Sequence, residues 1–463
     1  MDGWSIPANR LHSSLSVVLV SEMSEVGVIC SPSSVIQCDL WRLLASAPRL
    51  DVEDGGRRGP SISQFMSLLK AEPRVLVLLV CEDEIDGVLA LLQADLSPGD
   101  IVVSGGAENS LRSVSRALAL LSTQGVQYID CSRPFMGKLN PEDDKAGLVL
   151  LVGSEKREAA ALAETALSTY GPCTVLPVSN SGSGSGQYLR LAHDGLQTAL
   201  VQLHCEVHRV LCALACGGAE GPTPAQIYDD WVREDEGRLF TPGLARALPE
   251  TSGLRGPFAF VRNSESGGGE STAKEGWLAR ECQLATCPLP TITAALEVAR
   301  LALPLEVDAG GTPLTGPGEK PQVAPDQVAS DCRDALRLCY LASYAQIFAL
   351  LQATSCRRGW EMDLGEVARA WQCEGCGVGS STLRAVAGAL PGLKGSDGNV
   401  LSNRSVAADA SRRCSSLRRI VTLAVASGIP VPCLSATTAY LDTFRQRRHV
   451  GGGEFESSLS SWM

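Results

Sequence analysis

The chain has 463 residues, of which 44% are hydrophobic and 20% are charged, and its net charge is −11. This length is enough for two or three domains with large cores, whereas the acidic balance argues against binding to nucleic acid or to an anionic membrane surface. No apolar run reaches the roughly 20 residues of a membrane-spanning helix, and no secretory signal is visible, so the sequence predicts a cytoplasmic protein with no membrane partner.

The first part of the chain has the pattern of a parallel α/β sheet, because short apolar β-branched runs alternate there with helical patterns. Strands are predicted over residues 26–30, 75–80, 100–103, 147–152 and 174–177, and helices over residues 61–70, 109–123 and 155–170. The run over residues 75–80 is apolar throughout, which predicts a strand that is buried on both faces.

The pattern changes after a Gly/Ser-rich turn over residues 181–186, which we expect to be a hinge between domains. Helical periodicity follows as far as about residue 440, with helices predicted over residues 188–216, 290–303, 325–353 and 415–428. The predicted domains are an α/β domain over residues 1–180, an all-helical domain over residues 181–440 and a short tail over residues 441–463. The apolar stretch over residues 338–351 suits either an internal core or a subunit interface.

One segment carries a family resemblance. Residues 186–197 read G-Q-Y-L-R-L-A-H-D-G-L-Q, and they resemble the F-V-K-M-V-H-N-G-I-E-Y segment of 6-phosphogluconate dehydrogenases, register for register. Further landmarks occur in the family's order, and the likeness extends from about residue 17 to about residue 447; these landmarks are Ile227–Trp231, Ser343–Gln346, Gly359-Trp360 and Gly428–Cys433.

The resemblance implies a Rossmann-like NADP-binding domain, a large all-α domain and a homodimer. Enzymes of this family convert 6-phosphogluconate to ribulose 5-phosphate and CO₂ in the pentose phosphate pathway. Their catalytic Lys, His, Asn and Glu correspond here to Arg190, His193, Asp194 and Gln197. Arg190 stays protonated and cannot accept a proton, and Gln197 has no proton to exchange, so we expect the general acid–base chemistry of the family to be lost.

His193 is the retained member of this set. It is either a histidine of the core with its polar atoms satisfied or a substitute base next to Asp194. The resemblance places three further residues in the substrate site. Thr198 replaces a phosphate-binding Tyr, and Lys274 and Arg300 remain as side chains that could meet a phosphate.

The cofactor site is also changed. A dinucleotide site needs a glycine-rich turn that lets the pyrophosphate approach backbone N–H groups. The family's turn falls on Leu11–Ser16, which contains no glycine, after a segment interrupted by Pro7. Acidic residues at 82–84 follow the strand over residues 75–80, where the resemblance places the phosphates of the cofactor. A carboxylate and a phosphate charge about 6 Å apart repel by about 3 kcal/mol at a dielectric of 20, so these residues weaken cofactor binding. NADP is the cofactor that the resemblance implies, and only the hydroxyls of Ser13, Ser16 and Ser33 remain as candidate phosphate ligands.

No metal site is expected. His204 and His208 lie one helical turn apart, but no third ligand accompanies them. Cys373 and Cys376 form a lone C-x-x-C, which we interpret as a reduced pair, since most of the 17 cysteines lie scattered in apolar runs.

Three functions remain open from the sequence. The first is a catalytically degenerate homologue, a pseudoenzyme that serves as a scaffold or regulatory partner. The second is an active NADP-dependent oxidoreductase with this or a related hydroxyacid substrate. The third is a nucleotide-independent module that binds a small anionic metabolite through Arg190, Lys274 and Arg300.

Overall fold

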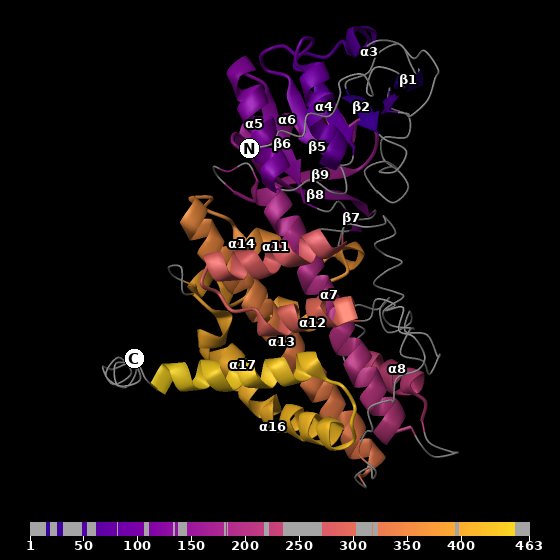
Figure 1. The fold of residues 1–463 in the computed structure, drawn as a ribbon, viewed down its shortest axis with the longest axis vertical. Helices are drawn as coiled ribbons and strands as arrows, with labels where there is room; N and C mark the ends of the chain where they lie inside the picture. Colours follow the sequence, from indigo (N-terminus) through magenta and orange to yellow (C-terminus); the bar gives the residue numbers. More distant parts are fainter. Residues whose placement is uncertain are drawn as a thin grey trace, which may run out of the picture. The chain divides into compact units, whose positions relative to one another are not determined.

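The structure is a computed structural model that describes residues 15–18, 26–30, 49–52, 62–80, 82–105, 111–132, 135–137, 146–179, 182, 184–216, 222–234, 271–301, 317, 323–393 and 398–449. The chain divides into two compact units, each assembled from two stretches of sequence. The first unit comprises residues 1–192 and 354–376, and the second comprises residues 193–353 and 377–463. The labelled strands all belong to the first unit (Figure 1).

The nine described strands form one sheet in the order β1-β3-β2-β4-β5-β6-β8-β7, and β9 pairs with β8. Their bounds are β1 Leu15–Val18, β2 Val26–Cys30, β3 Arg49–Val52, β4 Val75–Leu79, β5 Ile101–Ser104, β6 Gln127–Cys131, β7 Phe135–Gly137, β8 Gly147–Ser154 and β9 Cys173–Pro177. From β3 through β2, β4 and β5 to β6 the strands are parallel neighbours. The strand β1 pairs antiparallel with β3, and β8 pairs antiparallel with β6 and β7.

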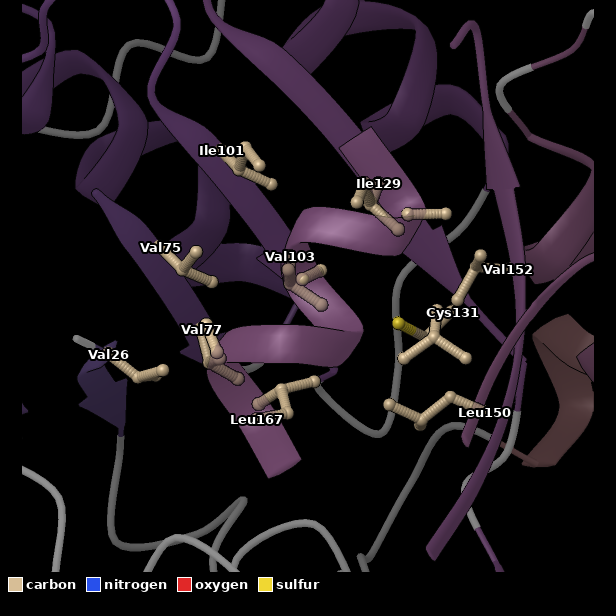
Figure 2. Packing of buried hydrophobic residues seen from close by; sticks show 14 of the residues in the cluster. Val26, Val75, Val77, Ile101, Val103, Ile129, Cys131, Leu150, Val152 and Leu167 are labelled. Atoms are coloured by element: carbon tan, nitrogen blue, oxygen red, sulfur yellow. The ribbon is translucent and has the colours of Figure 1, made fainter. Parts of the chain in front are cut away.

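Helices cover both faces of this sheet. The helices α3 (Ile62–Leu68), α4 (Glu82–Leu92) and α5 (Leu111–Leu121) pack on one face, and α6 (Arg157–Ser168) packs on the other. Successive residues of a strand point to opposite faces. Val75 and Val77 of β4 accordingly join the cluster beneath α6 (Figure 2), whereas Leu76 and Leu78 join the cluster on the opposite face. Burial on both sides explains why this strand is apolar throughout.

The chain after β9 is helical where it is described. The helices are α7 Ser185–Leu214, α8 Pro224–Glu234, α11 Ser271–Leu284, α12 Pro290–Leu301, α13 Pro325–Arg358, α14 Leu364–Trp371, α15 Ser381–Ala387, α16 Arg404–Ala426 and α17 Pro432–His449. Every residue of α13 from 338 to 351 is buried within the single chain. Of the two predicted roles for this stretch, the structure therefore supports the internal core. None of the described helices is long and apolar enough to cross a membrane.

The predicted fold class is confirmed: a Rossmann-like parallel sheet precedes a large all-α region. All five predicted strands are present with ends within two residues of those expected. The helix α4 is not among the predicted helices. Carboxylates in the first turn favour a helix, since they interact with the positive end of its dipole. Leu15 and Ser16, on which the resemblance places the end of the family's glycine-rich turn, lie in β1.

Candidate functional site

The four residues in the family's catalytic positions lie on one face of α7. Arg190, His193, Asp194 and Gln197 are spaced i, i+3, i+4 and i+7, which places them on one side of a helix. Arg190 and Gln197 are partly exposed, whereas only 4% of His193 is exposed. The nearest polar atoms of His193 and Asp194 are Nδ1 and Oδ1, 3.5 Å apart. They are the two side chains of this face that can exchange a proton.

The start of α7 is fixed by a carboxylate from the sheet. Asp130, near the end of β6, is 1% exposed and accepts hydrogen bonds from the backbone N–H groups of Gly184, at 2.6 Å, and Gln187, at 2.7 Å. These donors belong to the first turn of the helix, which has no partners of its own for them. Burial raises the pKa of Asp130 to about 6, and the hydrogen bonds from the backbone oppose this rise.

Glycines allow the sheet and the helix to approach each other at this point. A Cβ atom at Gly153 of β8 would lie 2.5 Å from Oδ1 of Asp130 and 2.7 Å from Oγ of Ser185. A Cβ atom at Gly186 would lie 2.7 Å from the backbone nitrogen of Gly153 and would clash with the carbonyl oxygen of Asp130. Neither position can hold a larger residue without a shift of the backbone.

The Gly/Ser-rich turn is tightly held where it is described. Gly182 donates its N–H to the carbonyl oxygen of Ser154, and its own carbonyl accepts the hydroxyl of Ser185 at 2.7 Å. A Cβ atom at Gly182 would clash with the indole ring of Trp360. The glycines at 182 and 186 thus serve close packing, and a hinge at this turn stays a prediction.

Further along α7, two glycines determine what surrounds the candidate face. A Cβ atom at Gly195 would lie 2.6 Å from the side chain of Leu278, so α11 approaches the helix closely there. Gly377 has a φ of +79°, and a Cβ atom on it would lie 2.8 Å from Nε2 of Gln197. The Gln197 amide therefore lies against the backbone at Gly377, at the position where the family has its carboxylic acid.

A tyrosine holds the segment that follows Gly377. The hydroxyl of Tyr344, on α13, donates to the carbonyl oxygen of Val378 at 2.6 Å and lies 2.9 Å from Oγ of Ser380. Tyr344 is fully buried. Two hydrogen bonds to one buried phenol fix this segment next to Gln197.

The predicted substrate residues are spread over three helices. Thr198 donates its hydroxyl to the carbonyl oxygen of Asp194 at 2.9 Å, one turn earlier in α7, so its proton is engaged within the helix. Lys274 lies in α11, and Arg300 is the penultimate residue of α12; their side chains lie outside the described part of the structure. Whether these three residues meet one ligand stays a prediction.

Of the three candidate cofactor residues the structure describes only Ser16, so their joint role stays a prediction. Ser16 lies in β1 and pairs with Asp51 of β3, and Ser13 and Ser33 lie outside the described residues. Glu82, Asp83 and Glu84 open α4, directly after β4. A nucleotide-binding turn offers bare N–H groups at such a helix start, whereas the first three residues of α4 are acidic.

The other motifs have structural explanations. His204 lies 2.8 Å from the hydroxyl of Tyr340, and burial lowers its pKa to about 3. His208 stacks on the ring of Tyr228. Among the described residues, no three His, Cys, Asp or Glu side chains are arranged to hold a metal ion. Cys373 and Cys376 are buried free thiols, and burial raises the pKa of Cys373 to about 11, which is opposite to the shift of a reactive cysteine.

Two structurally important carboxylates are not predicted from the sequence. One is Asp130, and the other is Glu206 of α7, which is fully buried. Glu206 accepts hydrogen bonds at 3.0 Å from the backbone N–H groups of Cys433 and Leu434, at the start of α17, and from the side chain of Gln202. For Glu206 the available signal was a carboxylate inside the long apolar run of α7, since such a residue is buried only when it is paired or hydrogen-bonded. The sequence around Asp130 gives no such signal.

Comparison with known proteins agrees with this architecture. Residues 186–451 match the family model of the 6-phosphogluconate dehydrogenase C-terminal domain. The chain is 27% identical over 400 residues to the chloroplastic decarboxylating 6-phosphogluconate dehydrogenase 2 of Spinacia oleracea, covering 81% of this chain and 70% of that protein. It is 27% identical over 411 residues to the enzyme of Synechococcus elongatus, covering 84% of this chain and 81% of that one. The solved structure of the Plasmodium falciparum enzyme superposes with a TM-score of 0.65 at 20% identity, covering 86% of this chain and 83% of that one.

Proposed function

The chain belongs to the 6-phosphogluconate dehydrogenase family, whose C-terminal domain matches more than half of it, and on this premise we propose that it is a catalytically inactive member. It keeps the fold of the family and acts without turnover, as a scaffold or a regulatory homologue. The observation that carries this proposal is the face of α7, where Arg190 and Gln197 occupy the positions of the family's proton carriers.

The chemistry of these two side chains supports the proposal. A hydride can leave a secondary alcohol only as the hydroxyl proton is taken up, and a guanidinium has no lone pair with which to accept it. An amide has no ionisable proton to give to the carbon that loses CO₂. Gln197 also lies against the backbone of Gly377, so it has a packing role that needs no ionisable group.

A second candidate is a family oxidoreductase with altered chemistry, which the relatives' named activity and one observation favour. His193 is buried with its Nδ1 3.5 Å from the carboxylate of Asp194, and an imidazole next to a carboxylate can serve as a general base. An active oxidoreductase requires a bound nicotinamide coenzyme, whereas a catalytically inactive family member does not.

The test is a turnover assay of the full chain with 6-phosphogluconate and either NADP or NAD, monitored by the absorbance of the reduced coenzyme. The enzyme of Synechococcus elongatus, assayed in the same buffer, is the positive control. We expect no coenzyme reduction above that of a blank without protein. Measurable turnover would overturn the proposal, and its loss in a His193→Ala variant would establish the second candidate.

Two further properties belong to the same proposal. A homodimer is what the family resemblance implies, and sedimentation of the chain tests it. A reducing, cytoplasmic location is supported by the 14 cysteines whose side chains the structure describes, which are free thiols.

A further inference from the structure

The cofactor implied by the family does not fit the sheet of this chain. In a dinucleotide-binding sheet of order 3-2-1-4-5-6, the first strand lies in the middle, and the turn after it carries the glycines that cradle the pyrophosphate. We infer that in this chain the strands on either side of that position pair directly with each other, so that the first strand is absent from the sheet and the chain binds neither NADP nor NAD. This inference deepens the proposed function and rests on it only for the identity of the coenzyme.

The pairing of β2 with β4 is the main observation. The resemblance places the turn after the family's first strand at Leu11–Ser16, so β2, β3 and β4 stand in the places of the family's second, third and fourth strands. In a sheet of order 3-2-1-4-5-6 the second and fourth strands lie on either side of the first. Here the two are parallel neighbours, joined through five residue pairs from Val26 with Val75 to Cys30 with Leu79. The other edge of β2 is taken by β3, and the other edge of β4 by β5. A strand has two hydrogen-bonding edges, so none can enter between β2 and β4 without breaking these pairs.

The chain segment before β2 points to the same conclusion. It contains β1, which lies beyond β3 at the edge of the sheet and runs antiparallel to it, with Leu15 opposite Val52. A nucleotide cradle has to follow a strand that runs parallel to its neighbours, because the site lies at their carboxyl ends. The strand β1 has neither that position nor that direction.

Removal of the central strand also changes the order of the sheet. The parallel strands β3, β2, β4, β5 and β6 have the order 2-1-3-4-5 of other doubly wound folds, whose ligand crevice lies between the first and third strands of the series. In this chain that point is the carboxyl edge of β2 and β4. The next helix, α4, begins there with Glu82, Asp83 and Glu84, which repel a diphosphate.

The experiment is isothermal titration of the full chain with NADP and with NADPH, alongside hydrogen exchange of the peptides that contain β2 and β4. We expect no saturable heat up to about 1 mM coenzyme and no change in exchange, while the Synechococcus elongatus enzyme binds under the same conditions. Saturable binding by this chain would overturn the inference. Binding without turnover would leave the proposed function standing, whereas turnover would overturn both.

A matched variant separates topology from charge. Glu82→Gln, Asp83→Asn and Glu84→Gln together remove the repulsion and leave the strands in place. Because the missing element is a strand and its turn, we expect this triple variant to bind no better than the parent. If it binds NADP saturably while the parent does not, electrostatic repulsion alone was the barrier and the topological inference fails.

Discussion

The carboxylate of Asp130 lies 2.7 Å from the backbone nitrogen of Gln187, 57 residues further along the chain. One strand end thereby caps a 30-residue helix that carries the candidate site. The cap belongs to the sheet and not to the helix, so the start of α7 depends on β6.

The first prediction concerns the titration of this cap. The pKa of Asp130 is raised by burial to about 6 from an ordinary value of 3.8, so the folded state holds the proton more tightly than the unfolded state. The stability it contributes is therefore fully present below about pH 4 and is lost as the pH rises through 6. Relative to Asp130→Asn, the parent should gain about 2 kcal/mol between pH 7 and pH 4. Urea unfolding of both proteins across this range measures the difference, and parallel curves would contradict it.

A second prediction tests the close approach at the same junction. Gly186→Ala should lower the free energy of unfolding by about 3 kcal/mol or more, because its Cβ meets backbone atoms that cannot move aside. Gly392→Ala is the matched control, since no atom lies within 4 Å of its Cβ, and it should change stability by at most about 0.5 kcal/mol. Equal effects of the two substitutions would show that the contact at Gly186 is absent.

The third prediction addresses Glu206. Removing its carboxylate leaves the buried N–H groups of Cys433 and Leu434 without their acceptor, and each such group costs about 1–3 kcal/mol. We expect Glu206→Ala to destabilise by about 3 kcal/mol and Glu206→Gln by less, since an amide keeps one acceptor oxygen. Asp229→Ala, at an exposed carboxylate of α8, is the control for chemical denaturation. A Glu206→Ala variant as stable as this control would refute the capping role.

The fourth prediction concerns activity. Restoring both proton carriers with Arg190→Lys and Gln197→Glu should give no NADPH production from 6-phosphogluconate, because the inferred strand order leaves no nucleotide site. Absorbance of NADPH in a coupled time course is the measurement, and circular dichroism shows whether the double variant is folded. Turnover by this variant would mean that the sheet still binds the coenzyme.

A fifth prediction distinguishes the cysteines. Iodoacetamide should label Cys356 and Cys212, which are exposed, well before Cys373 and Cys376, which are 4% and 5% exposed. The raised pKa of Cys373 slows it further, because the thiolate is the reactive form. Peptide mass spectrometry at successive times gives the order. A disulfide between Cys373 and Cys376 in freshly prepared protein would contradict the reduced pair.

The sequence predicts those helices and strands that are determined by local residue patterns. Unbroken apolar runs reveal β4 and β8, and helical periodicity locates α7 and α13 to within a few residues. The strand β6 is missed, since it reads Q-Y-I-D-C and its polar residues break the pattern. The burial of Asp130 has a non-local cause, because the N–H groups that it accepts from lie at the start of α7. No propensity of β6 itself encodes that contact.

The candidate site is predictable in its residue identities but not in its surroundings. The family register identifies Arg190, His193, Asp194 and Gln197, and the helix keeps them on one face. That Gln197 lies against Gly377 follows only from the folded chain, since 180 residues separate them. Strand order is likewise invisible in the sequence, because the apolar runs of β2 and β4 look the same whether or not another strand lies between them.

The Gly/Ser-rich stretch before α7 has the composition of a linker, yet Gly182 is fastened between Ser154 and Trp360. At Gly182 an inserted peptide or a proteolytic cut would disrupt these contacts. Cutting the chain at Gly182 to obtain separate halves would therefore remove the start of α7 from the first unit. A boundary for expressing fragments has to be sought elsewhere.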